Sequence, residues 1–145
     1  MVTPRALDQH RLVGLDTMVF VYAFERHAEF GPACEAILRS IEAGEVEAVM
    51  SSLVLGELLV RPFRENRPDV VHRYLDTLGR LPHLEQVPAD GPICQRAAQL
   101  RGQAPALRLP DAVHIATAIS RGATALISSD ARLPANAGLT ILRPG

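Results

Sequence analysis

The chain has 145 residues, 48% hydrophobic and 21% charged, a composition that fits one globular domain rather than a disordered or fibrous protein. Its formal net charge of −1 excludes the strongly basic surface of a protein that coats nucleic acid. Every basic residue is arginine, and a chain without lysine has no P-loop, protein-kinase active site or Schiff-base lysine.

The sequence also excludes several compartments and frameworks. Its two cysteines, Cys34 and Cys94, are too few for a disulfide scaffold or a zinc cluster. Its apolar runs are far shorter than the ~20 residues that cross a bilayer. The first ten residues include Asp8 and no apolar core, unlike a secretory signal. We therefore expect a cytoplasmic protein without a membrane span.

The first half of the chain contains two short apolar runs, which predict buried strands, and three segments with helical character. β-branched residues in TMVFVYAFE leave a strand as the alternative to its helix. Pro62 is expected to bend or end the third helix. The predicted elements are a strand over 12–15, helices over 17–25 and 31–43, a strand over 48–51 and a helix over 53–61.

The second half continues the alternation of strands and helices. Pro110 in the first turn and Gly122 just after the last turn bound one clear helix. The alternation predicts an α/β fold: a mostly parallel sheet of four to five strands with helices on both faces, in a single domain over residues 1–145. The predicted elements are helices over 68–81, 89–101 and 110–121, and strands over 84–87, 125–128 and 140–142.

Four of the 16 acidic residues stand in apolar sequence. Asp16 ends VGLD, Glu57 interrupts LVLGELLV, Asp111 heads PDAVHIATAI, and Asp130 follows ALISS. A buried carboxylate is costly unless it is paired, hydrogen-bonded or bound to a metal. The ends of parallel strands and the first turns of the flanking helices face one crevice, where such folds bind ligands. We therefore expect the four acids to converge there.

Converging carboxylates require protons or a cation. Two of them ~4 Å apart repel by roughly 4 kcal/mol at an effective dielectric near 20. Oxygen ligands without a Cys/His set favour Mg²⁺ or Mn²⁺. Each acid also has a purely structural interpretation, as a helix cap (Asp16), an exposed helix residue (Glu57), a first-turn acid favoured by the helix dipole (Asp111) or a turn residue (Asp130). Their shared edge favours the metal site.

From about Val13 to Leu142 the sequence resembles the PIN-domain ribonucleases, and in particular the VapC-like toxins of bacterial toxin–antitoxin pairs. The matching motifs are LDTMVFVYAFE, SSLVLGELL, LRLPDAVHIATAI and ALISSDARL, each with one of the four acids. No single motif is specific, but their order and spacing together are. The segment ARLPANAGL departs from the family, which often has an aromatic residue there.

The resemblance implies a three-layer PIN-like fold and an endoribonuclease that hydrolyses RNA with Mg²⁺ or Mn²⁺, leaving 5′-phosphate and 3′-hydroxyl ends. It implies a small antitoxin and a second copy of the chain as partners. Asp16, Asp111 and Asp130 would be the direct metal ligands, and Glu57 would bind a second ion or orient water. The resemblance also places two hydroxyls beside the metal, those of Thr17 and Ser128.

Two other functions stay open. A catalytically silent PIN-like binding module would act only by assembling with a partner, and loss of an acid would mark it, whereas all four are present. A housekeeping PIN nuclease would share the site and lack the antitoxin. Metal-dependent cleavage would distinguish a nuclease from the silent binding module. Growth arrest on expression would distinguish a toxin from the housekeeping nuclease.

Several further residues have two interpretations each. The arginines of the segment after Glu57 are candidates for steering phosphates, or form a plain solvated patch. His114, one turn from Asp111, lies near the metal or is a satisfied core histidine. The aromatic residues fit the core or an interface better than a base-stacking platform, since aromatics are only 4% of the chain. These residues are Arg61, Arg64, Arg67, Phe20, Tyr22 and Phe24.

Overall fold

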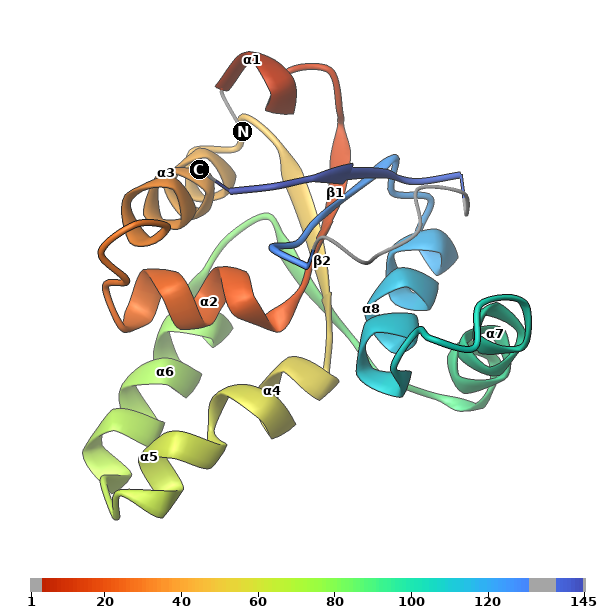
Figure 1. Cartoon of the computed structure of the whole chain (residues 1–145). Coiled ribbons are helices and arrows are strands. Elements are labelled where there is room, and N and C mark those ends of the chain that lie inside the picture. The colour runs from red at the N-terminus through yellow and green to blue at the C-terminus, as the bar shows by residue number, and fades with distance from the viewer. Residues whose placement is uncertain (1–3, 131–137, 145) are drawn as a thin grey trace.

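A parallel sheet lies at the centre of the computed structural model, which describes residues 4–130 and 138–144 (Figure 1). Its strand order is β3-β2-β1-β4-β5, and every neighbouring pair runs parallel. Residues 131–137, which include most of the segment that departs from the family, lie outside the described residues. The strands are β1 (Leu12–Leu15), β2 (Glu47–Ser51), β3 (Leu84–Val87), β4 (Ala125–Ile127) and β5 (Thr140–Leu142).

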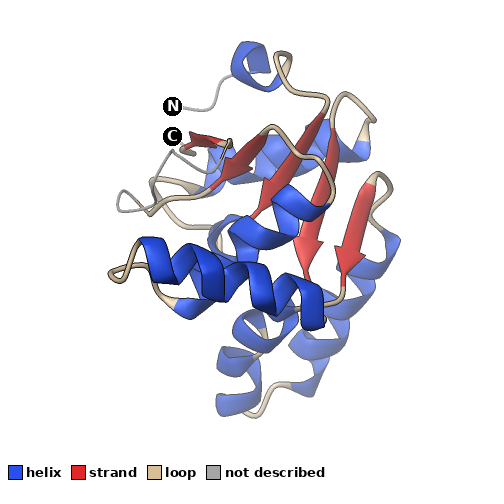
Figure 2. Cartoon of the chain, turned by 90° about the vertical axis from the view of Figure 1, so that its right-hand side faces the viewer, coloured by secondary structure: helices blue, strands red, loops and turns tan. Residues whose placement is uncertain are grey.

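Helices cover both faces of this sheet, which confirms the predicted three layers (Figures 1 and 2). A short helix, α1 (Pro4–Leu7), precedes the first strand and is not predicted by the apolar pattern. No helix in the described part of the chain has the length and apolar character needed to cross a membrane. One face carries α2 (Thr17–Phe24), α3 (Gly31–Glu42), α4 (Leu53–Leu58), α5 (Val60–Arg64) and α6 (Pro68–Arg80), and the other carries α7 (Gly91–Gln103) and α8 (Leu109–Ser120).

Each central strand contributes alternate residues to two separate cores, because successive side chains of a strand point to opposite faces. In β1, Val13 and Leu15 pack with α2 and α3. In β4, Ile127 packs on that same side and Leu126 packs with α7 and α8. Both faces of the central strands are therefore buried, which accounts for their short, continuous apolar sequences.

Gly14, in the middle of β1, lets the sheet and α8 approach each other closely. A Cβ atom added at this position would stand 2.7 Å from the Cβ of Ala118 and 3.1 Å from Leu126 Cδ1. Such a separation is shorter than a carbon–carbon contact allows. The strand that leads to Asp16 is thus seated directly against the helix that carries Asp111.

The strands at 12–15, 84–87 and 140–142 have the predicted bounds, and the other strands and most helices differ from the prediction by one or two residues at an end. The single helix predicted over 53–61 is wrong, because the structure has α4 and α5, separated at Leu59. Pro62 is the physical reason, since it has no N–H to donate to Leu58 and its ring crowds that carbonyl.

The two cysteines have opposite surroundings, which predicts different reactivity. Cys34 is fully buried on α3, and burial together with the charge of Asp16 raises its pKa to about 12. Cys94 on α7 is exposed. Because only the thiolate reacts, we expect a thiol reagent to label one site per native chain and two after denaturation. Native Cys94→Ser protein should stay unlabelled, and rapid labelling of that variant would contradict this burial of Cys34.

Candidate active site

All four acids predicted to form a site lie at the carboxyl edge of the sheet. Asp16 follows β1 directly and Asp130 lies three residues beyond β4. Glu57 belongs to α4, which follows β2. Asp111 is in the first turn of α8, the helix that leads into β4. The segments that carry them are far apart in sequence, and the parallel topology brings these segments to one edge.

Asp16 is a helix cap and a buried acid at the same time. Its backbone is extended, and its Oδ1 accepts a hydrogen bond of 3.0 Å from the N–H of Met18 at the start of α2. The residue is only 6% exposed. Burial raises its pKa above the ordinary value, and hydrogen bonds from Ser128 and the backbone, with the charge of His114, oppose this rise. No described cation forms an ion pair with Asp16, and the effect of burial on its pKa outweighs that of these contacts.

Ser128 connects the ends of the two central strands. Its side chain is fully buried just after β4. It forms a hydrogen bond with Asp16, and its Oγ accepts another, of 3.1 Å, from the N–H of Asp130. A hydroxyl both donates and accepts, so one small residue joins the loops that carry two of the candidate ligands.

Glu57 contacts two side chains from other elements. The Thr17 hydroxyl donates to Glu57 Oε1 at 2.6 Å, and His114 Nε2 lies 2.9 Å from the same oxygen. Thr17 Oγ1 and His114 Nε2 are themselves 3.3 Å apart. The hydrogen bond from His114 is the main cause that lowers the pKa of Glu57; burial opposes it, and Thr17 adds to it. Glu57 is thus held as a carboxylate.

His114 combines features of both of its interpretations. It is buried, as a core histidine would be, with a side chain 3% exposed. It is not fully satisfied, because its Nδ1 is buried without a hydrogen-bond partner among the described residues. It also contacts Glu57, one of the candidate site acids. The sequence signal was its place three residues after Asp111, on the same side of the helix.

Asp111 has a partner that the sequence analysis missed. The guanidinium of Arg108 donates from Nε to Asp111 Oδ2 at 3.1 Å across the first turn of α8. Its charge also helps to lower the pKa of Glu57. The i,i+3 spacing of the two residues was the available signal, and it becomes informative only once the start of α8 is known.

These contacts connect three of the four acids, Asp16, Asp130 and Glu57, and the acids do not form a ready-made metal cage. One group joins Asp16 and Asp130 through Ser128, the other joins Glu57 to Thr17 and His114, and the peptide bond between Asp16 and Thr17 links the two. Within residues 4–130 and 138–144, no three His, Cys, Asp or Glu side chains are grouped so that they could hold one ion. The structure brings Asp111 into contact with Arg108 rather than with another acid.

Two of the three candidate phosphate-binding arginines are already paired. Arg61 contacts Glu25 at 2.9 Å and Glu65 at 2.8 Å. Arg67 makes two hydrogen bonds to Asp69 and lowers the pKa of that carboxyl to about 2. No described residue pairs with Arg64. The patch is therefore close to neutral, which favours the solvated-patch interpretation for Arg61 and Arg67.

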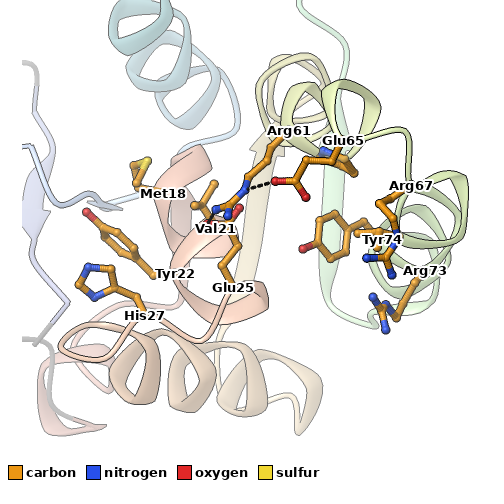
Figure 3. A pocket seen from close by; sticks show the side chains of 12 residues that line it. Met18, Val21, Tyr22, Glu25, His27, Arg61, Glu65, Arg67, Arg73 and Tyr74 are labelled. Carbon is orange, nitrogen blue, oxygen red and sulfur yellow. Dashed lines mark hydrogen bonds and ion pairs between the residues drawn. The ribbon is translucent and has the colours of Figure 1, made fainter.

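A groove of about 520 Å³ lies between α2 and the α5–α6 pair (Figure 3). It begins at Met18, whose N–H contacts Asp16, and the ion pair of Arg61 with Glu25 joins its two walls. Tyr22 and Tyr74 contribute aromatic surface to it. The groove has mixed charge and contains none of the four candidate acids.

The aromatic residues of α2 pack as predicted rather than forming a stack on the surface. Phe20 is fully buried. Phe24 lies between Phe20 and Tyr74, with ring centroids 6.1 Å and 4.9 Å away. Tyr22 packs against His27 and Phe30 at 4.6 Å and 5.2 Å. These contacts tie α2 to α6 and to the segment before α3.

Comparison with known proteins agrees with this architecture. The family model described as PIN domain matches residues 13–139. Among solved structures, VapBC2 from Rickettsia felis bound to a promoter DNA fragment has a TM-score of 0.73 and 18% identity, covering 92% of this chain and 99% of that one. A toxin–antitoxin complex from Klebsiella pneumoniae has a TM-score of 0.66 and 20% identity, covering 89% and 94%. DNA-bound VapBC from Salmonella typhimurium has a TM-score of 0.65 and 18% identity, covering 92% and 97%. Comparison with the curated proteins gives no match.

Proposed function

This chain belongs to the PIN-domain family, and on that premise we propose that it is a metal-dependent endoribonuclease and the toxin of a toxin–antitoxin pair. One observation carries the proposal. Asp16 is a buried carboxylate without a cationic partner in the described residues, and Ser128 joins it to the loop of Asp130 at the carboxyl edge of the sheet. Its hydrogen bonds offset the cost of burial only in part, since burial still raises the pKa of Asp16, and a bound cation would offset the rest.

A divalent cation fits this edge by the chemistry of the donors. The candidate groups are carboxylates, the ligands that Mg²⁺ and Mn²⁺ prefer. Asp16, Asp111 and Asp130 would hold the ion, and Glu57 offers a further carboxylate. A bound cation would lower the pKa of water and offset charge on the scissile phosphate. It would also reverse the local negative field that otherwise repels RNA.

The residues of the chain supply position and charge. Capping of α2 holds the Asp16 carboxylate at the end of β1, and Ser128 holds the next strand end against it. Glu57, kept ionised by its hydrogen bonds, is an acceptor for a water proton at this edge. Arg108 is exposed and paired with Asp111, so its guanidinium could contact a phosphate that enters over the start of α8.

The partners follow from the same premise. The similar structures from Rickettsia felis, Klebsiella pneumoniae and Salmonella typhimurium are toxin–antitoxin complexes, and their chains are covered almost completely. We therefore propose that a small antitoxin protein sequesters this chain, and that the chain forms a homodimer. Light scattering of the purified chain should give twice the mass of one chain.

The proposed activity predicts metal-dependent cleavage of RNA. The purified chain should cut an end-labelled single-stranded RNA with Mg²⁺ or Mn²⁺, because the acidic edge accepts phosphates only when cations occupy it. EDTA should stop cleavage, and excess Mg²⁺ should restore it. The products should carry 5′-phosphate and 3′-hydroxyl ends. The matched control is a DNA oligonucleotide of the same sequence, which should stay intact.

Three results distinguish the functions that the sequence leaves open. A silent binding module would show neither metal binding nor EDTA-sensitive cleavage. A housekeeping nuclease would cut RNA in vitro, and its expression would leave growth unimpaired. A toxin should arrest growth, and Asp16→Ala or co-expression of the small gene encoded beside it should relieve the arrest.

A further inference from the structure

We propose that His114 is a positioning residue for Glu57: with Thr17 it occupies the carboxylate oxygen Oε1 and leaves Oε2 as the single oxygen that Glu57 offers to a bound cation. The inference rests on the proposed function, since it concerns the cation site proposed at the carboxyl edge of the sheet. It assigns His114 a role in holding the Glu57 carboxylate, and no direct role at the ion or the RNA.

The geometry places two donors on one oxygen. Thr17 Oγ1 and His114 Nε2 are 2.6 Å and 2.9 Å from Glu57 Oε1. An ionised carboxylate only accepts hydrogen bonds, so Nε2 must carry the proton of the imidazole in this contact. No described residue donates to Oε2, and the side chain of Glu57 is 36% exposed. One oxygen is therefore held by two donors, and the other accepts no hydrogen bond from the described residues.

The packing of His114 indicates that its contact with Glu57 serves function rather than stability. Its Nδ1 is buried and has no partner among residues 4–130 and 138–144. A buried polar atom without a hydrogen bond is costly, and an apolar residue of similar size would avoid that cost. The residues on either side of it in α8, Val113 and Ile115, are apolar and buried. The histidine is thus explained by its contact with Glu57 and not by the filling of space.

The clamp, formed by Thr17 and His114 on Glu57, joins three elements that the sequence separates. Thr17 begins α2, Glu57 lies on α4, and His114 lies on α8. Local sequence around Glu57 therefore cannot set the orientation of its carboxylate.

A carboxylate with both oxygens free can bind a cation through two oxygens, as in many Ca²⁺ sites, whereas Mg²⁺ demands near-octahedral geometry around a smaller ion. Because Thr17 and His114 hold Oε1, Glu57 can bind a cation through Oε2 only, which favours Mg²⁺ or Mn²⁺ over the larger Ca²⁺.

The test measures Mn²⁺ binding without RNA, using the paramagnetic resonance signal of free Mn²⁺ and the full chain. His114→Leu keeps the side-chain size and removes the donor, and it should weaken Mn²⁺ binding by about 10–100-fold, the usual effect of losing a group that orients a ligand. His114→Gln, whose amide nitrogen reaches a similar position, should restore most of the affinity. Ca²⁺ binding, measured by competition, should fall less than Mn²⁺ binding.

A double variant tests whether His114 acts through Glu57. Glu57→Gln/His114→Leu should bind Mn²⁺ as Glu57→Gln does, since the histidine has no ligand left to orient. The melting temperature of His114→Leu should equal or exceed that of the wild type, because the unpartnered Nδ1 is gone. A purely structural histidine would give the opposite pattern: additive losses of affinity and a lower melting temperature.

Matched variants complete the experiment. His83 Nδ1 lies 3.0 Å from Glu47 Oε1, a similar pair at the amino edge of the sheet, so His83→Gln should leave Mn²⁺ binding unchanged. Thr17→Val should weaken binding and Thr17→Ser should not, which tests the clamp without touching α8. Wild-type Mn²⁺ affinity in both His114→Leu and Thr17→Val, with reduced affinity in Glu57→Gln, overturns the inference and keeps the proposed function. Unchanged affinity in Glu57→Gln and Asp16→Asn overturns the proposed function, and the inference with it.

Discussion

Asp16→Asn is expected to slow Mg²⁺-dependent RNA cleavage by about 1,000-fold, equivalent to about 4 kcal/mol of transition-state stabilisation. An amide is a poor ligand in place of the buried carboxylate that the ion would bind. The substitution is otherwise conservative, because the amide oxygen can still accept from Met18 and cap α2. Initial cleavage rates at saturating Mg²⁺ measure the effect, and a loss of less than tenfold would remove Asp16 from the proposed metal site.

The same substitution should stabilise the metal-free protein. Burial raises the folded-state pKa of Asp16, so the folded protein binds this proton more tightly than the unfolded chain does. At neutral pH the buried charge is destabilising, and stability is recovered as pH falls through the folded pKa. Asn carries no charge, so its melting temperature should exceed the wild-type value by about 3 °C for each ~1 kcal/mol gained.

Three comparisons make this stability prediction specific. The difference in melting temperature between Asp16→Asn and wild type should shrink as the wild-type carboxyl becomes protonated in acid. Mn²⁺ should stabilise the wild type and leave Asp16→Asn unchanged, because a ligand stabilises only the state that binds it. Asp16→Ala also loses the helix cap, which costs about 1 kcal/mol. A lower melting temperature for Asp16→Asn than for wild type would show that the charge is already compensated.

Gly14→Ala is expected to destabilise the protein by about 1–3 kcal/mol, the usual cost of overpacking a core, because its added Cβ makes the closest contact among the described glycines. The new Cβ would stand 2.7 Å from Ala118 Cβ, so β1 and α8 must separate. Because these two elements carry Asp16 and Asp111, we also expect the variant to bind Mn²⁺ more weakly. Urea unfolding measures the stability, and Mn²⁺ titration measures the site.

Two variants control for the addition of a methyl group itself. Gly79 lies in α6, and a Cβ added there would have nothing within 4 Å, so Gly79→Ala should stabilise the protein by about 0.5–1 kcal/mol through helix propensity. Gly14→Ala/Ala118→Gly removes the colliding methyl and should recover part of the lost stability. A Gly14→Ala protein as stable as wild type would mean that α8 moves away from the sheet freely.

The strands and layers were predictable from sequence because both faces of the sheet are covered. Burial on two faces makes the central strands β1 and β4 short apolar runs, and such runs are visible without a structure. The interruption between α4 and α5 was harder to place. Pro62 signals a disturbance, but the interruption falls three residues earlier, at Leu59, because the hydrogen bond that Pro62 cannot make is the one to the carbonyl of Leu58.

The site was predictable in its location and not in its contacts. The end of a strand and the start of a helix place Asp16 and Asp111 at one edge of the sheet, independently of their side-chain conformations. The hydrogen bonds of Glu57 depend on rotamers in α2 and α8, which no local pattern encodes. The sequence shows that His114 lies close to Asp111 on one helix, but its contact with Glu57 joins α8 to a different helix, α4.

The residues Ala112 to Ala118 of α8 are all buried, and the apolar ones among them belong to the core on the α7–α8 side of the sheet. Amide protons of such a helix exchange with solvent only through global unfolding, whereas Gly56 and Glu57 lie on an exposed surface of α4. Deuterium uptake should therefore be slow beneath Asp111 and His114 and faster around Glu57. We therefore expect α8 to form the more rigid side of this edge, and α4, which carries the Glu57 carboxylate, to open more easily.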